Sequence, residues 1–144
     1  MIRAVLLMLS MVTASVYAAI LPGSECAAPG RFIEQGLFSA FTKDLLIARS
    51  SVNRNKTTVE VLSITPVSDV FARQLAKTDT AAGNGLSEDD YYGIYHNGHV
   101  MNLAARYTYI NADGKKDIFI ASALLNDDEC SIRHNGYLTI SREF

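Results

Sequence analysis

The sequence has few of the side chains, and none of the short motifs, on which common active sites are built. It contains only two cysteines and three histidines, and it has no Cys-x-x-Cys or His-Glu-x-x-His motif that would indicate a redox or zinc centre. It also lacks a Gly-x-Ser-x-Gly nucleophile elbow and a glycine-rich phosphate-binding loop. We therefore expect a protein that is not an enzyme and that needs no cofactor.

Charge is also sparse and nearly balanced. There are 13 basic and 15 acidic side chains, with a net charge of −2. A weakly acidic protein has little attraction for a phosphate backbone, so we expect no nucleic-acid partner. After residue 18, no apolar run is long enough to cross a bilayer, so we expect no membrane span in residues 19–144.

The first 18 residues have the pattern of a bacterial export signal. Arg3 gives a positive start, residues 4–12 are apolar but too short to span a bilayer, and Val16-Tyr17-Ala18 resembles a small-residue cleavage site. We expect cleavage after Ala18. Residues 19–144 would then form one exported domain, periplasmic or secreted.

Both cysteines lie in the part of the chain that we expect to be exported. In an oxidising compartment such pairs are usually structural, so we expect a disulfide between Cys26 and Cys130. Closing a loop of about 100 residues stabilises a fold by about 4–5 kcal/mol in the chain-entropy treatment. The bridge would tie the segment before the first helix to the strand region near the end of the sequence.

The longest helical pattern covers residues 32–49. Its main apolar residues recur at intervals of four: Ile33, Leu37, Phe41 and Leu45. This spacing forms one stripe and predicts a helix that packs against a sheet. Gly36 lies within this pattern and costs the helix up to about 1 kcal/mol relative to alanine. Close packing against a neighbouring element is one explanation for a glycine at this position.

The middle of the sequence is less clear. Residues 57–65 are rich in β-branched side chains and predict a strand that Pro66 ends. Residues 67–78 fit either a short helix capped by Ser68 or an alternating strand, and their good helix formers favour the helix. Residues 78–90 are polar and rich in turn residues, which predicts a mobile surface loop that is either a contact region or a disordered segment.

The stretch from Tyr91 to Phe144 predicts an antiparallel meander. Its turn dipeptides are Asn97-Gly98, Asp113-Gly114 and Asn135-Gly136, whose residues tolerate the positive φ of tight hairpins. The expected strands cover residues 91–96, 99–110, 116–125, 130–134 and 137–142, with an acidic bend at 126–129. A helix on such a sheet is an α+β fold, and in outline it resembles the cystatin-like and NTF2-like folds, in which a curved sheet wraps a helix.

The histidines offer one hypothesis for a metal site. In a two-residue turn at Asn97-Gly98, His96 and His99 would face each other with their Cβ atoms about 5 Å apart. Such a pair could bind Zn²⁺ or Cu²⁺ if His134 or a carboxylate completed the set. Exposed residues at the end of a hairpin are the simpler interpretation, so these two are weak candidates and no metal is expected.

Two acidic clusters suggest contact regions. The predicted partner-binding site consists of Glu88, Asp89, Asp90, Tyr91, Tyr92 and Tyr95. Carboxylates can steer a basic partner, and tyrosine is enriched at interfaces. The second cluster, Asp127-Asp128-Glu129, is interpreted as solvated loop charge, with docking of a basic partner as the alternative.

These observations favour a small, non-catalytic, protein-binding module. It would act as an inhibitor, an immunity-type protein or an envelope accessory protein, and its partner would be another protein of the envelope or outside the cell. The alternative hypothesis is a periplasmic domain that binds a small ligand or a metal.

Overall fold

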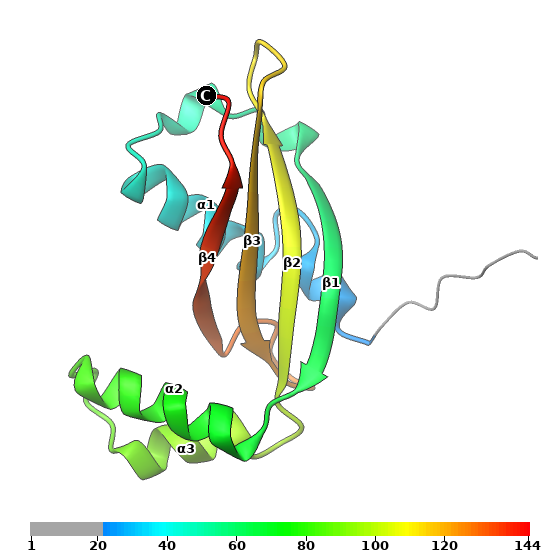
Figure 1. Ribbon diagram of the computed structural model, residues 1–144. Helices are drawn as coiled ribbons and strands as arrows, with labels where there is room; N and C mark the ends of the chain where they lie inside the picture. Colours follow the sequence, from blue (N-terminus) through cyan, green and yellow to red (C-terminus); the bar gives the residue numbers. More distant parts are fainter. Residues whose placement is uncertain (1–21) are drawn as a thin grey trace, which may run out of the picture.

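The computed structural model describes residues 22–144, so the predicted export signal lies outside the described residues. This part of the chain forms three α-helices and one four-stranded sheet (Figure 1). The helices are α1 (Phe32–Asp44), α2 (Asp69–Ala81) and α3 (Glu88–His96), and the strands are β1 (Thr58–Pro66), β2 (Met101–Ile110), β3 (Lys116–Leu125) and β4 (Arg133–Ser141). The predicted α+β class, with a helix that precedes a β-meander, is confirmed.

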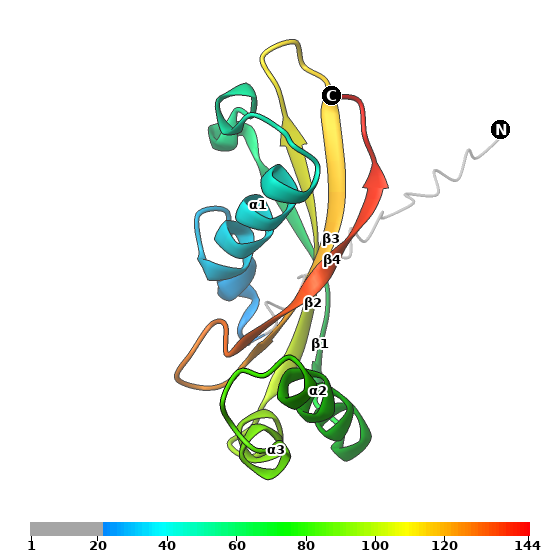
Figure 2. The ribbon, with the colours of Figure 1, turned by 90° about the vertical axis from the view of Figure 1, so that its left-hand side faces the viewer.

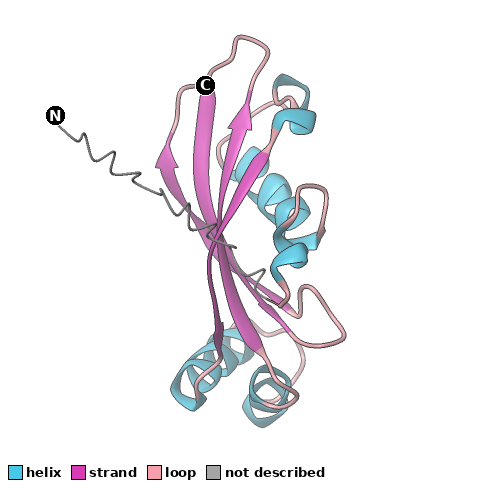
Figure 3. Cartoon of the chain, turned by 90° about the vertical axis from the view of Figure 1, so that its right-hand side faces the viewer, coloured by secondary structure: helices cyan, strands magenta, loops and turns pink. Residues whose placement is uncertain are grey.

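The sheet has the order β1-β2-β3-β4, and all three strand pairs are antiparallel. Helix α1 lies on one face of the sheet, and α2 and α3 lie together at one of its ends (Figure 2). The opposite side view shows the same division of the helices (Figure 3). Within the described residues, β1 and β4 are the edge strands of this sheet. The pair of helices α2 and α3 lies between β1 and β2 in the sequence, at the end of the sheet where β1 ends and β2 begins.

The main core lies between α1 and the sheet. On β2, alternate residues are buried in the core that includes α1: Leu103, Ala105, Tyr107 and Tyr109. On α1, Phe41 stacks on Phe119 of β3 with ring centroids 4.5 Å apart. Strand β3 lies between β2 and β4 and is apolar on both faces, and its Leu124 is buried against the α2–α3 pair.

Helix α1 ends at Asp44, five residues earlier than predicted. Leu46 takes a left-handed conformation with φ 55°, and the amide of Ile47 donates to the carbonyl of Thr42 at 3.0 Å. These features end a helix, because they satisfy its last carbonyls without a further turn. The apolar spacing predicted the buried face correctly but carried no information on this end.

The predicted helix after Pro66 is confirmed as α2, and the side chain of Ser68 caps it by accepting from the amide of Phe71 at 3.2 Å. The predicted loop at 78–90 is wrong, since α2 continues to Ala81 and α3 begins at Glu88. A capping box starts α3: Ser87 accepts from the amide of Asp90, whose carboxylate accepts from the amide of Ser87. Only a short connection remains between the two helices.

The predicted strand at 91–96 is wrong, because these residues form most of α3. The strand preference of its tyrosines suggested a sheet, but Tyr91 and Tyr95 are one helical turn apart and pack together against α2. Asn97-Gly98 therefore joins a helix to β2 instead of two strands. The expected pairing of His96 with His99 across a hairpin does not occur.

The last predicted hairpin is also wrong. Asn135-Gly136 lies inside β4, where Gly136 pairs with Ser122 and His134 pairs with Ala123. Asn135 is the extra residue of a β-bulge, a feature that glycine-containing dipeptides also favour. Of the three predicted turns, only the one at Asp113-Gly114 connects two strands of the sheet.

Candidate functional site

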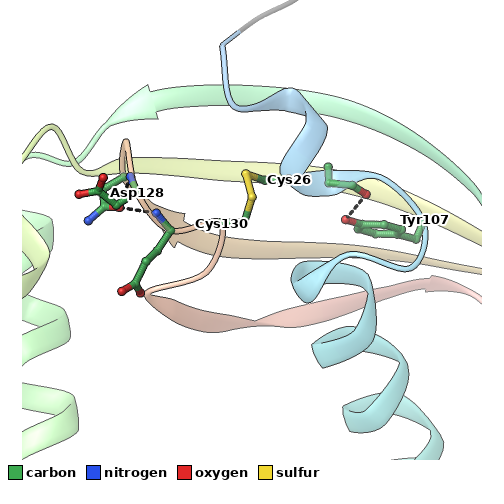
Figure 4. The surroundings of a disulfide bond; sticks show 7 residues. Cys26, Tyr107, Asp128 and Cys130 are labelled. Atoms are coloured by element: carbon green, nitrogen blue, oxygen red, sulfur yellow. Dashed lines mark hydrogen bonds between the residues drawn. A yellow bond between two sulfur atoms is a disulfide. The ribbon is translucent and has the colours of Figure 1, made fainter.

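The predicted disulfide between Cys26 and Cys130 is confirmed, and it links positions 104 residues apart in sequence. It joins a short 3₁₀ turn, η1 (Ser24–Ala27), to the loop that follows β3 (Figure 4). The hydroxyl of Tyr107 on β2 donates to the carbonyl of Ala27 at 2.8 Å, in a buried position. Two segments far apart in sequence are thereby held against the same end of the sheet.

Beside this disulfide lies a pocket of about 640 Å³. Its apolar lining comes from β1, β2 and β3, through Ile64, Met101 and Leu125, together with both cysteines. Leu125 is buried, and the side chain of Ile64 is half-buried. The pocket therefore has an apolar floor that the sheet supplies, with walls that the disulfide ties together.

Acidic side chains surround this floor. They are Glu25 from η1 and Asp127, Asp128 and Glu129 from the loop after β3, and we call these four the acidic rim. The loop is shaped by Asn126, whose side-chain oxygen accepts from the amides of Asp128 and Glu129 at 2.9 and 2.7 Å. The acidic bend predicted at 126–129 is confirmed, and all four rim residues are exposed.

The charge of the rim is largely uncompensated. Among the described residues that line the pocket there is no lysine or arginine, and the only basic side chain is His99. His99 lies 3.2 Å from the carboxylate of Asp127, and both side chains are more than three-quarters exposed. Within residues 22–144, Glu25, Asp128 and Glu129 form no ion pair. The pocket thus combines an apolar floor with a local excess of negative charge.

The partner site predicted from the sequence lies on α3, and its residues have different environments. Tyr91 and Tyr95 are only 8% and 4% exposed, so they pack the helix and offer no contact surface. Asp90 belongs to the capping box, and its hydrogen bonds with Ser87 hold the pKa of its carboxyl below the usual range. In the first turn of α3, Asp89 is exposed and Glu88 is half-buried.

Tyr92 is partly exposed but already engaged. Its hydroxyl donates to Asp69 of α2 at 2.6 Å, and the guanidinium of Arg73 lies 4.2 Å from the centre of its ring. The ring of His96 also stacks on the ring of Tyr92, with the ring centroids 5.0 Å apart. These contacts join α3 to α2, so the aromatic part of the predicted site has a structural role.

The histidines do not form the metal site considered above. His96 belongs to α3, His99 precedes β2, and the ring of His134 packs against Gly36 of α1. In the part of the chain that the structure describes, no group of three or more His, Cys, Asp or Glu side chains could hold a metal ion. The pairing of His96 with His99 required two strands, and the helix removes it.

The sequence did not predict two of the ionic groups that join separate elements. Arg133 of β4 donates from Nε and Nη2 to the carboxylate of Asp79 on α2, at 2.7 and 2.8 Å, which holds the pKa of Asp79 below its usual range. Glu34 of α1 is 1% exposed and pairs with Arg54, while Tyr109 donates to it at 3.0 Å. Every charged group in these sets has partners within the protein, so both serve to hold elements together.

The pocket itself was missed because its parts come from segments far apart in sequence. Ile64, Met101 and Leu125 read as ordinary strand residues, and only the tertiary fold brings them beside Glu25. One signal was available: a disulfide between Cys26 and Cys130 necessarily brings the acidic cluster at 127–129 close to Glu25. The disulfide and the acidic cluster together indicate the rim.

No helix among residues 22–144 is sufficiently long and apolar to span a membrane. The likeness to cystatin-like and NTF2-like folds remains a likeness of outline, and fold alone would not indicate function. Comparison of the chain with protein-family models, with curated proteins and with solved structures gives no match.

Proposed function

We propose that this protein is an exported, non-catalytic binding module that holds a partner protein at the acidic-rimmed pocket. The observation that carries the proposal is the combination of an apolar floor with four exposed carboxylates at the end of the sheet that the disulfide closes. An apolar patch with a charged border is the usual composition of a protein contact site. The disulfide supports an oxidising location, which agrees with the export expected from the first 18 residues.

The position of the charges favours a protein as the partner. Small-ligand sites usually hold their ligand with a few polar groups fixed inside the cavity. Here the described carboxylates lie at the exposed rim, where they can attract and orient an approaching basic surface. One observation favours the alternative of a small ligand, namely the volume of about 640 Å³, which lies within the range of roughly 300–1,000 Å³ that such sites occupy.

The experiment compares three immobilised forms of the processed protein in capture from a cell-envelope extract. The first is unchanged, the second carries Asp128→Lys with Glu129→Lys at the rim, and the third carries Glu88→Lys with Asp89→Lys on α3. Both variants reverse two acidic charges, so the third is a control matched in charge. Quantitative mass spectrometry then compares what each form retains.

We expect one protein that the unchanged form and the α3 variant retain and that the rim variant loses. Loss with the α3 variant alone would place the contact on α3, as the sequence suggested, and would overturn the pocket as the contact site. Retention by all three forms would overturn both sites. Circular dichroism of each form confirms that the charge changes leave the fold intact.

A further inference from the structure

We infer that the pocket receives a lysine or arginine side chain of the partner. This inference rests on the proposed function and specifies the chemistry of its ligand. The first support is the shape of the lining, since the apolar floor lies inside and the carboxylates lie at the entrance. Lysine and arginine have the same division, with an apolar stem of three or four methylene groups and a charged head.

The second support is the sign and the distribution of the charge. Glu25 lines the pocket from η1, while Asp128 and Glu129 line it from the loop that the disulfide joins to η1. A guanidinium or ammonium group has several N–H donors that point in different directions, so it can meet carboxylates from two walls. An anionic side chain would meet repulsion from the same groups.

The third support is that these carboxylates are available. Asp79, Glu34 and Asp117 are all engaged by arginines inside the protein. In contrast, within the described residues Glu25, Asp128 and Glu129 have no cationic partner, and only Asp127 has a histidine beside it. A basic group from outside would therefore bind without displacing an existing ion pair.

The spacing of the rim favours an organic cation over a metal ion. Within residues 22–144, no three acidic, histidine or cysteine side chains converge closely enough to hold a metal. Divalent cations require several ligand atoms within about 2.0–2.6 Å, whereas hydrogen bonds to an ammonium or guanidinium reach about 2.7–2.9 Å and tolerate separated carboxylates. The apolar floor would also contribute nothing to a bare ion.

The test uses free analogues of the side chains, with the processed protein labelled with ¹⁵N. The probes are n-butylguanidinium and n-pentylammonium chloride, with n-pentanol as the neutral control and sodium pentanoate as the anionic control. Amide shifts in two-dimensional NMR spectra locate each probe and give its affinity. We expect the two cations to shift the amides of Met101, Leu125 and the loop at 126–130, with affinities at least tenfold higher than that of pentanol.

A variant with Asp128→Asn and Glu129→Gln should reduce the preference for the cations over pentanol at least threefold, and the control Glu88→Gln with Asp89→Asn should leave it unchanged. Equal binding of pentanol and the cations, or cation shifts located elsewhere, would overturn the inference. The two proposals fail separately. Rim-dependent capture of a partner without binding of the analogues would leave the proposed function standing and reject a basic side chain as its ligand.

Discussion

Replacement of Gly36 by alanine should destabilise the protein, although alanine is the better helix former. A Cβ atom at this position would lie 3.0 Å from Cδ2 of His134, which is tighter than ordinary contacts. The ring has little freedom to move, because it packs between α1 and β4 and its Nδ1 accepts from the amide of Gly136 at 3.2 Å. Helix propensity should gain about 1 kcal/mol, while overpacking costs about 1–3 kcal/mol.

The overpacking cost less the gain in helix propensity leaves a net loss of about 1 kcal/mol in the free energy of unfolding for Gly36→Ala. Urea denaturation followed by circular dichroism measures it. Gly93 of α3 provides a matched control, because a Cβ there would meet only Asn97 Nδ2, at 3.7 Å. Gly93→Ala should therefore stabilise the protein by up to about 1 kcal/mol.

A double variant isolates the contact. With His134→Ala added, Gly36→Ala should lose most of its cost, because the ring that it meets is gone, and the two changes should couple by more than about 0.5 kcal/mol. The reasoning would be refuted if Gly36→Ala stabilised the protein as much as Gly93→Ala does. That result would mean that α1 and β4 adjust freely to an added methyl group.

Three further predictions concern stability. Burial, and then the nearby charge of Arg133, lower the pKa of His134 in the folded protein, so the unfolded chain binds a proton at His134 more readily. The contribution of His134 to the free energy of unfolding should therefore be complete above about pH 6.5 and should fall below it. Urea titrations at pH 7.5 and 5.5 should show a pH difference in stability that is smaller in the His134→Phe variant. Arg133→Ala should cost about 1–3 kcal/mol, because the half-buried carboxylate of Asp79 loses its ion pair and keeps only the Tyr95 hydroxyl as a side-chain donor, and adding Asp79→Ala should recover part of the loss; full additivity in urea denaturation would contradict this. Cys26→Ser with Cys130→Ser should cost about 2–5 kcal/mol and should weaken n-butylguanidinium binding, since the pocket walls are no longer tied; unchanged NMR affinity in the folded variant would show that the disulfide does not hold the site.

Elements fixed by local pattern were predicted well. The spacing of Ile33, Leu37 and Phe41 identified the buried face of α1. A chain with only two cysteines has one possible internal disulfide, and the expectation of export favoured its formation. In each case a single physical cause, apolar burial or oxidation, determines the outcome.

The errors arose where two local causes compete. In residues 87–96 the strand preference of tyrosine opposed a capping box at Ser87 and the one-turn spacing of Tyr91 and Tyr95, and packing of α3 on α2 decided for the helix. Asn-Gly dipeptides likewise serve as hairpin turns, as connections and as bulges. Which of these occurs depends on strand pairing elsewhere, which a local pattern does not contain.

The candidate site could be predicted only in part, for a different reason. The acidic cluster at 127–129 was visible in the sequence, but its function depends on an apolar floor from three strands. Those strand residues have no distinctive local pattern, since any sheet needs them. The charge of a site can thus be read from a segment, while its shape requires the fold.

The central claim, that a partner protein inserts a basic side chain into the acidic-rimmed pocket, is tested most directly by competition. The captured partner is eluted from the immobilised protein with increasing n-butylguanidinium chloride or ammonium chloride, while sodium chloride holds the total ionic strength constant, so that general screening is the same throughout. The account predicts release by n-butylguanidinium at concentrations at least tenfold lower than by ammonium. Equal release by the two salts would contradict it, because the partner would then be held by general charge attraction and not by a side chain in the pocket.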